Sequence, residues 1–372
     1  MQYYSLQKQS PNVDFRTAAI TGQAPDKGLY FPTEIPKFTA AQIERFKTLD
    51  KASLAFEVMR PYVGDTIDDA TLKNICAETI NFHFPLVPIT DTISSLELFH
   101  GPTLAFKDVG ARFMSRCLGY FSKQARAENA TANDHKSQED KTQGENPNTV
   151  LVATSGDTGG AVANGFLGVA GVDVIILYPK GKVSPIQELQ LTTLGQNITA
   201  LEVDGSFDDC QQMVKQAFAD KELNKKLFLT SANSINIARW LPQQFYYFLA
   251  YKQWPDKNYP PVISVPSGNF GNICAGILAK QSGLPVSHFI AACNANDIVS
   301  EYLESEKLTP RPAVATLSNA MDVGNPSNFV RILEIFHHQF PALKSKLSSY
   351  TISDQETMDT IKAVYELENY MH

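Results

Sequence analysis

The chain has 372 residues, of which 43% are hydrophobic and 19% charged, and its formal net charge is −7. This length exceeds one small domain, so two or three packed units are expected. The mildly acidic charge, without a basic stripe, argues against a nucleic-acid partner, and no apolar stretch reaches the length of a membrane span.

The first residues and the cysteines bear on cellular location. Residues 1–8 lack the charged segment and apolar core of a secretory signal. The cysteines have no C-x-x-C spacing and lie mostly in apolar runs, which is typical of buried thiols in a reducing compartment. They are Cys76, Cys117, Cys210, Cys274 and Cys293. The sequence predicts a soluble, cytoplasmic protein without disulfides, and it leaves both a monomer and a homodimer open.

The chain divides by pattern near residue 85. Residues 1–85 mix polar and apolar positions at helical spacing with few strand signals, which predicts a small, mostly helical N-terminal domain. Over residues 86–372, strand-like runs alternate with helical ones, which predicts an α/β region of two subdomains. Such alternation favours right-handed βαβ crossovers, so we expect open, largely parallel sheets covered by helices on both faces.

The expected strands are 150–154, 172–178, 198–203, 227–230, 262–265 and 289–293, and expected helices include 185–194, 208–218 and 237–254. Residues 125–148 contain no large apolar side chain and are expected to form a mobile polar insertion. No metal site is predicted, because His337 and His338 lie in an apolar helical run where packing is the favoured role.

One lysine lies in a setting that would change its chemistry. Lys107 follows Leu104, Ala105 and Phe106 and begins an amphipathic helical pattern. An ammonium that loses hydration there has a lowered pKa, so its free amine can attack an aldehyde and form a Schiff base. The alternative is a snorkelling lysine at a helix start with Asp108 as an N-terminal charge, and this segment alone does not decide between the two.

Two glycine loops each join an expected strand to an expected helix. Residues 155–161 read SGDTGGA and residues 267–273 read SGNFGNI. At such turns, backbone N–H groups at a helix N-terminus are open to an anion that glycines allow to approach. Neither loop has the spacing of a dinucleotide site or a P-loop, although each is also compatible with a structural turn. Together with Lys107, the loops predict a pyridoxal phosphate enzyme.

Five sequence blocks resemble one known family in the expected order. They are Gly28-Leu-Tyr-Phe-Pro32, His100-Gly-Pro-Thr-Leu-Ala-Phe-Lys107-Asp108, Thr154-Ser-Gly-Asp-Thr-Gly159, Asn233-Ser-Ile-Asn-Ile-Ala-Arg239 and Ala320-Met-Asp-Val-Gly-Asn-Pro-Ser-Asn328. The family is threonine synthase, a lyase of threonine biosynthesis in the tryptophan-synthase-β-like group of pyridoxal 5'-phosphate enzymes. The resemblance implies fold type II and the conversion of O-phospho-L-homoserine and water to L-threonine and phosphate.

The resemblance also implies roles for particular residues. Lys107 would hold the cofactor and then move protons as the catalytic base. Gly268, Asn269, Phe270, Gly271 and Asn272 would cradle the cofactor phosphate through backbone N–H groups. Ser155, Thr158, Asn236 and Arg239 would bind the substrate.

Two of these residues need comment. Arg239 would bind the substrate phosphate with two parallel hydrogen bonds, although a surface salt bridge is the ordinary role of an isolated arginine. Asp157 is a departure, because more distant relatives have an asparagine that donates to the cofactor ring oxygen, and an ionised aspartate cannot donate. Asp157 is therefore assigned to cofactor binding with its role open.

Other functions fit part of the same pattern. A serine or threonine dehydratase of the same fold would share Lys107 and the glycine loop without needing Arg239. A non-catalytic homologue would bind pyridoxal phosphate or small anions without turnover, and a dinucleotide-binding protein is disfavoured by the glycine spacing.

The last residues carry a further expectation. Family members normally continue beyond a segment like residues 365–372 into a Pro-His-Thr-Ala-type motif and a tail, which commonly supplies a hydroxyl facing the pyridine nitrogen. We therefore expect a fragment or an incompletely resolved chain, with an exposed apolar patch where the tail would lie.

Overall fold

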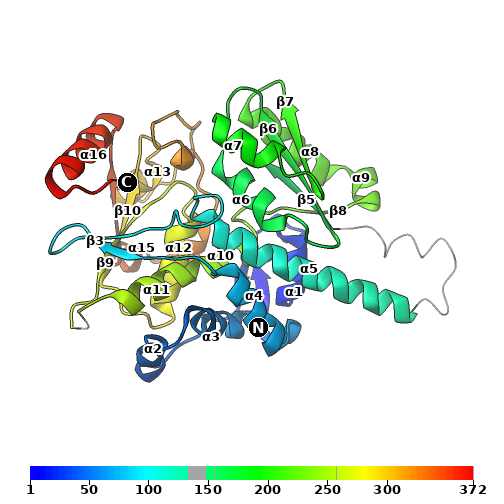
Figure 1. Ribbon diagram of the computed structural model, residues 1–372, viewed down its shortest axis with the longest axis horizontal. Coiled ribbons are helices and arrows are strands. Elements are labelled where there is room, and N and C mark those ends of the chain that lie inside the picture. Colours follow the sequence, from blue (N-terminus) through cyan, green and yellow to red (C-terminus); the bar gives the residue numbers. More distant parts are fainter. Residues whose placement is uncertain (133–147, 155, 257, 372) are drawn as a thin grey trace. The chain divides into compact units, whose positions relative to one another are not determined.

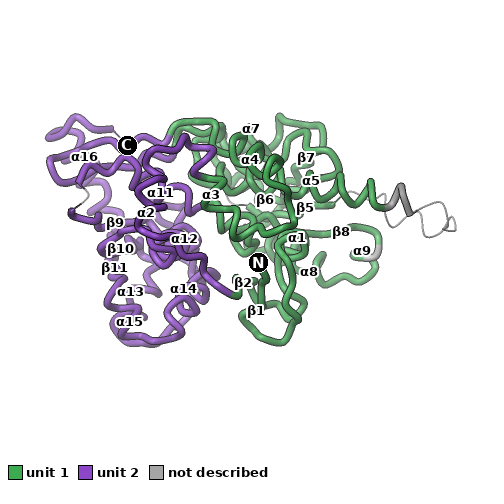
Figure 2. Tube along the Cα trace, turned by 90° about the horizontal axis from the view of Figure 1, so that it is seen from below, with its two compact units in different colours: residues 1–33, 55–83, 99–242 green, residues 34–54, 84–98, 243–372 purple. Residues whose placement is uncertain are grey.

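The computed structural model describes residues 1–132, 148–154, 156–256 and 258–371. By its internal contacts the chain forms two compact units, each assembled from three segments (Figure 2). Unit 1 comprises residues 1–33, 55–83 and 99–242, and unit 2 comprises residues 34–54, 84–98 and 243–372. This division interleaves the N-terminal residues with the rest of the chain, so the domain boundary at residue 85 stays a prediction.

Unit 1 is built on a parallel sheet with the strand order β7-β6-β5-β8 (Figure 1). Its strands are β5 (Asn148–Ala153), β6 (Val172–Pro179), β7 (Ile198–Val203) and β8 (Phe228–Thr230). Its helices are α1 (Phe15–Thr21), α4 (Asp69–Thr79), α5 (Lys107–Ala132), α6 (Asp157–Phe166), α7 (Pro185–Thr192), α8 (Phe207–Ala219), α9 (Lys221–Lys226) and α10 (Ile237–Trp240), with the 3-10 turn η1 (Gly64–Thr66). Helix α3 (Lys51–Val63) spans the sequence boundary at residue 54.

Both faces of this sheet are covered. Successive side chains of β5 point to opposite faces, and its residues from Thr149 to Ala153 are all buried. On one face, Leu151 and Ala153 pack with Cys210 of α8. On the other, Val150 and Val152 are fully buried, and helices α5 and α6 also contact the sheet. The expected parallel sheet covered on both faces is confirmed.

A short antiparallel ribbon supports the part of unit 1 that carries Arg239. Strand β1 (Tyr3–Ser5) pairs with β2 (Tyr30–Pro32), which contains most of the Gly28–Pro32 block. The Tyr3 hydroxyl donates to the Tyr62 carbonyl oxygen at 2.7 Å, and the Phe31 ring lies 5.9 Å from the Trp240 ring. The first residues of the chain thus pack directly against α10.

Unit 2 contains a parallel sheet of order β11-β10-β9 and an antiparallel hairpin of β3 and β4. Its strands are β3 (Leu86–Pro88), β4 (Ser94–Leu96), β9 (Val262–Pro266), β10 (His288–Cys293) and β11 (Leu347–Thr351). Its helices are α2 (Ala40–Phe46), α11 (Gln244–Gln253), α12 (Gly271–Gln281), α13 (Ile298–Ser305), α14 (Phe329–Ile335), α15 (Phe340–Lys344) and α16 (Asp354–Glu368), with the 3-10 turn η5 (Asn319–Met321).

The predicted strands are confirmed to within two residues at either end, and both glycine loops follow the carboxyl ends of strands, β5 and β9. The expected helix over 237–254 is wrong as one element. It breaks into α10, the 3-10 turn η4 (Leu241–Gln243) and α11, because Pro242 has no N–H to donate to the preceding turn of a helix.

The predicted insertion at 125–148 is partly wrong. Residues 125–132 continue α5, since alanine, arginine and glutamate favour helix, and Glu128 pairs with Arg16 at 3.1 Å. Asn148 begins β5. The rest of the predicted insertion, 133–147, lies outside the described residues.

Candidate active site

Lys107 is the first residue of α5, and its amine is partly buried. Its side chain is 17% exposed, and its Nζ lies 4.9 Å from the centre of the Phe106 ring. The Nζ donates to both carboxylate oxygens of Asp157 at 2.7 Å. Burial lowers the pKa of Lys107, Asp157 opposes this shift, and the positive charge of Arg239 adds to it. Asp157 and Arg239 therefore both change the pKa of Lys107, and all three are predicted site residues.

The loop before α5 is folded by an aspartate whose role the sequence left open. The buried carboxylate of Asp108 accepts the Thr103 N–H at 3.0 Å and the Thr103 hydroxyl at 2.5 Å. Leu104 has a positive φ of 59° and is 67% exposed, so it does not help to desolvate Lys107 as expected. Phe106 does so instead. Asp108 thus positions the lysine from the next residue of the helix.

Asp157 opens α6, where the helix N-terminus has no side-chain cap. Gly156 is the N-cap, and the Thr154 hydroxyl accepts the N–H groups of Gly156 at 3.1 Å and Gly159 at 2.9 Å. Thr158 follows Asp157 in the first turn and is partly exposed. Ser155, which is predicted to contact the substrate, lies outside the described residues.

Gln187 of α7 lies beside the N-terminus of α6, a position that the sequence did not predict. A Cβ added at Gly156 would lie 3.1 Å from Gln187 Nε2 and 3.2 Å from Gln187 Oε1. The carboxamide is therefore adjacent to the open turn of α6, where it can both donate and accept. Nothing in the pattern of residues 185–194 marks this position, because only the packing of α7 on α6 brings it there.

Asn236 and Arg239 are held in α10, whose N-cap is Asn236. The fully buried Asn236 accepts the Ala238 N–H at 2.9 Å and donates to the Ala19 carbonyl oxygen at 2.8 Å. These bonds hold its amide within the fold, and the predicted substrate contact stays a prediction. Arg239 is 3% exposed, and its backbone N–H donates to the Asn236 carbonyl oxygen at 3.1 Å. Asn236 therefore positions the arginine.

A glycine lets α5 and α10 approach each other. A Cβ at Gly110 would lie 2.6 Å from the Arg239 backbone oxygen and 3.3 Å from its Nε. Gly110 is three residues after Lys107, so this close packing brings the arginine side chain to the turn that carries the lysine. The absence of a side chain at Gly110 is thus part of the site.

We predict that Gly110→Ala destabilises the protein by about 1–3 kcal/mol, because overpacking outweighs the roughly 1 kcal/mol that alanine gains over glycine in a helix. Urea unfolding followed by circular dichroism would measure this. Gly119→Ala on the same helix is the control, since its Cβ would meet only a Val169 methyl group, at 2.8 Å. Equal or greater stability of Gly110→Ala would contradict the packing argument.

Unit 2 carries the second set of donors, in the loop between β9 and α12. Phe270 is the N-cap of α12 with a φ of 62°, and its side chain is 2% exposed and 5.7 Å from the Phe329 ring. Within the described chain, the backbone N–H groups of Gly268, Phe270, Gly271 and Asn272 have no hydrogen-bond acceptor. They form an open set of donors at a helix N-terminus, which is the arrangement that binds phosphate.

The two asparagines of this loop use their side chains internally. Asn269 Oδ1 accepts the Ser327 N–H at 2.7 Å, and Asn272 Nδ2 donates to the Pro266 carbonyl oxygen at 2.7 Å. The predicted binding of a phosphate by the backbone N–H groups of this loop stays a prediction. A Cβ at Gly268 would lie 2.6 Å from Met321 Cα, so this position needs glycine.

Each set of groups is compatible by its chemistry with one functional group of pyridoxal 5'-phosphate. Unit 1 provides a desolvated amine for an aldehyde, and unit 2 provides open N–H groups for a phosphate. In the described part of the chain, no group of three or more His, Cys, Asp or Glu residues is arranged to hold a metal ion. Across the same residues, no helix has both the length and the apolar character to cross a membrane.

Comparisons with known proteins agree with this chemistry. A family model described as threonine synthase N terminus matches residues 2–80, and one described as pyridoxal-phosphate dependent enzyme matches residues 95–371. A threonine synthase from Serratia marcescens is 44% identical over 368 residues, which cover 99% of this chain and 81% of that protein. The threonine synthase of Escherichia coli K12 is 42% identical over the same coverage.

Solved structures give the same result. The crystal structure of the Escherichia coli threonine synthase matches with a TM-score of 0.87 over 100% of this chain and 82% of that one, at 42% identity. A pyridoxal-phosphate-bound threonine synthase from Brucella melitensis matches with a TM-score of 0.89, 35% identity and the same coverage. A tomato threonine deaminase, at 14% identity and a TM-score of 0.57, shares only the fold.

Proposed function

The chain belongs to the threonine synthase family, and we propose how its own residues convert O-phospho-L-homoserine and water to L-threonine and phosphate. The observation that carries the proposal is the partly buried Lys107 amine, 2.7 Å from Asp157 and near enough to Arg239 for the guanidinium to lower its pKa. An amine, a carboxylate and a cation brought together from α5, α6 and α10 can bind and move both protons and anions.

Lys107 has two functions in this proposal. Its Nζ would hold pyridoxal 5'-phosphate through the aldehyde carbon, whose oxygen leaves as water, and as a free amine it would move the proton at the substrate Cα. When bound, the cofactor supplies an electron sink that stabilises negative charge at the substrate Cα and then at Cβ. A lowered pKa suits both functions, because a protonated amine neither attacks an aldehyde nor accepts a proton.

Asp157 acts on the charge of Lys107 rather than as a donor to a ring oxygen. Its carboxylate accepts two hydrogen bonds from the ammonium, so it holds the amine at the N-terminus of α6. It also keeps the pKa of Lys107 from falling further. The aspartate found here in place of asparagine is therefore compatible with cofactor binding through the lysine.

Arg239 and the N-terminus of α6 are proposed to bind the substrate phosphate. A guanidinium that is 3% exposed is desolvated, which strengthens its attraction for a dianion. The open first turn at Thr158, with Ser155 before it, adds hydroxyl and N–H donors. Phosphate leaving from Cγ then keeps its charged partners, so this site favours departure of the leaving group.

The loop Gly268–Asn272 is proposed to bind the cofactor phosphate through backbone N–H groups, because its side chains are engaged elsewhere. The molecule thus offers one group of donors for each of the two phosphates that the reaction requires. Location in the cytoplasm is supported by the five cysteines, all of which are buried and free. Whether the chain acts as a monomer or homodimer stays a prediction that light scattering would test.

A product assay tests the function. Purified protein with pyridoxal 5'-phosphate should release phosphate and threonine in equal amounts from O-phospho-L-homoserine. A dehydratase would instead produce a 2-oxo acid from serine or threonine. A non-catalytic homologue would retain the cofactor and release neither product.

We predict that Asp157→Asn shifts the reactivity of Lys107 to lower pH, because the charge that raises its pKa is lost. Arg239→Gln should shift it to higher pH, since a charge that lowers the pKa is removed. The measurement is the pH dependence of borohydride-trapped coupling of pyridoxal, which has no phosphate, to Lys107. Shifts of the same sign in both variants would refute the assignment.

A further inference from the structure

One segment of unit 2, residues 311–328, returns over the Gly268–Asn272 loop. The backbone of Met321 leaves no room for a side chain at Gly268, as the 2.6 Å approach of its Cα shows. Further along, Ser327 donates its N–H at 2.7 Å and its hydroxyl at 2.9 Å to Asn269 Oδ1. The shape of the loop therefore depends on where this segment lies.

The position of Met321 is determined by the next residue, Asp322. One carboxylate oxygen accepts Asn294 Nδ2 at 2.8 Å and Asn296 Nδ2 at 3.1 Å. The same oxygen accepts the Thr316 hydroxyl at 2.8 Å, and the other oxygen accepts the Thr316 N–H at 3.0 Å. Four donors thus converge on one carboxylate beside Met321.

Two of the four donors come from the end of the strand next to the loop, and the other two belong to Thr316 of the segment itself. Asn294 and Asn296 follow β10, which pairs in parallel with β9, and β9 leads directly into Gly268–Asn272. The Ser267 N–H also donates to the Ala292 carbonyl oxygen at 2.9 Å. Asp322 therefore ties the 311–328 segment to the same sheet edge from which the loop begins.

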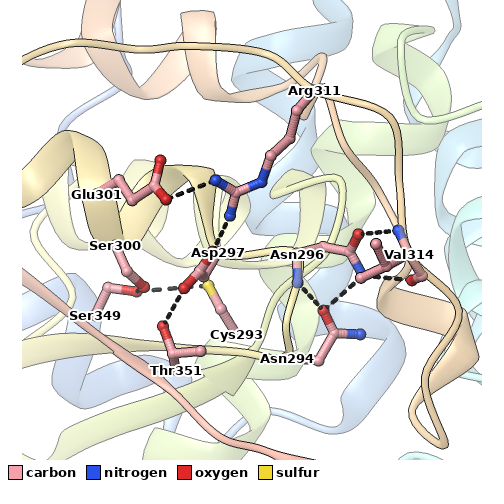
Figure 3. A network of polar contacts seen from close by, with 10 residues as sticks. All are labelled: Cys293, Asn294, Asn296, Asp297, Ser300, Glu301, Arg311, Val314, Ser349 and Thr351. Atoms are coloured by element: carbon pink, nitrogen blue, oxygen red, sulfur yellow. Dashed lines mark hydrogen bonds and ion pairs between the residues drawn. The ribbon is translucent and has the colours of Figure 1, made fainter.

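A second network holds the start of this segment farther from the loop. Figure 3 shows the Arg311 guanidinium between the carboxylates of Asp297 and Glu301. Arg311 Nη1 donates to Glu301 Oε1 at 2.5 Å. Nearby, the side chain of Asn296 forms hydrogen bonds with the backbone of Val314. The Arg311 and Glu301 side chains are 40% and 48% exposed, so their ion pair contributes little to the stability of the fold. Because Arg311 belongs to the same segment as Asp322, this exposed ion pair serves as a comparison for the hydrogen bonds of Asp322.

We propose that Asp322 is a positioning residue that shapes the Gly268–Asn272 loop for a phosphate-bearing cofactor. The proposal rests on the proposed function of that loop. The carboxylate is needed because it accepts four hydrogen bonds with two oxygens, whereas the amide of asparagine has one acceptor oxygen and adds two donors. In Asp322→Asn, the new amide N–H donors would face donors that now bind the carboxylate. Met321 would then move away from Gly268.

The test compares two ligands on the same protein. Protein freed of cofactor is titrated with pyridoxal 5'-phosphate and with pyridoxal, and binding is followed by absorbance. Both ligands react with Lys107, so the ratio of their affinities isolates the contribution of the phosphate. We expect Asp322→Asn to lose about tenfold or more in affinity for pyridoxal 5'-phosphate, the equivalent of one charge-assisted hydrogen bond, and to keep its affinity for pyridoxal.

Glu301→Gln is the matched control, because it breaks the outer ion pair without touching Asp322, and it should leave both affinities unchanged. If the wild-type protein binds the two ligands equally well, the loop does not bind phosphate and its proposed function fails. If the wild-type protein discriminates and Asp322→Asn discriminates as well, only the positioning role is overturned.

A milder variant covers the case in which Asp322→Asn does not fold. Thr316→Val keeps the backbone donor and removes only the hydroxyl that Asp322 accepts. Its affinity ratio should fall by about threefold, less than in Asp322→Asn, because the carboxylate keeps its other three donors. An unchanged ratio in this folded variant would also overturn the proposal.

Discussion

Lys107→Ala is expected to abolish both threonine formation and covalent attachment of pyridoxal 5'-phosphate. Lys107 is the partly buried lysine whose amine lies between the Phe106 ring and Asp157, and its pKa is lowered by burial. Without the amine, neither the bond to the aldehyde nor proton transfer at the substrate Cα can occur. Borohydride reduction followed by peptide mass spectrometry should label the wild-type peptide at Lys107 and leave the variant unlabelled.

Lys123→Ala is the matched control, since Lys123 is an exposed lysine of the same helix. It should keep full labelling at Lys107 and full activity. A labelled lysine elsewhere in Lys107→Ala, together with remaining turnover, would show that another residue binds the cofactor.

Arg239→Ala is expected to reduce kcat/KM for O-phospho-L-homoserine roughly 30-fold to 4,000-fold, because a desolvated dianion loses its charged partner. This corresponds to a loss of about 2–5 kcal/mol of transition-state stabilisation. Arg239→Lys should restore only part of this loss, since an ammonium cannot form two parallel hydrogen bonds with a phosphate. Steady-state kinetics and competition by inorganic phosphate would measure both effects.

Because Arg239 is buried, its loss also affects packing against Gly110. Arg239→Met keeps much of the volume and should lose catalytic efficiency as Arg239→Ala does, while unfolding at a urea concentration closer to that of the wild type. Arg16→Ala removes a more exposed arginine and should change neither property. Wild-type kinetics in Arg239→Met would assign the arginine to structure alone.

Local pattern was sufficient for much of the fold. Strand β5 follows from an apolar run bounded by turn residues, because a strand buried on both faces must be continuously apolar. The strands β7 and β9 were also predicted from apolar runs, although each keeps exposed residues. The apolar face of α5 follows from three- and four-residue spacing, and Val109, Phe113 and Cys117 are all fully buried. The break at Pro242 was also present in the sequence, where the helical pattern around it outweighed a known helix breaker.

The chemistry of the site divides in the same way. The residue types at 104–107 and the two glycine loops were enough to predict a reactive lysine and anion binding, since desolvation and open N–H groups are local properties. The matched order of five motifs then indicated the family. What these patterns could not supply was any contact between residues far apart in the chain.

Those contacts required the tertiary structure. Packing across Gly110 brings Arg239 to Lys107, and the α6 turn brings Asp157 within 2.7 Å of the same amine, so one lysine pKa depends on residues 50 and 132 positions away. Burial likewise gave Asn236 a role as the N-cap of α10, which its place in the motif did not indicate. The sequence by itself determined which groups are reactive, because that depends on side-chain type and neighbours in the chain. The tertiary structure decided which groups act on one another, because electrostatic and hydrogen-bond energies depend on distance and burial rather than on order along the chain.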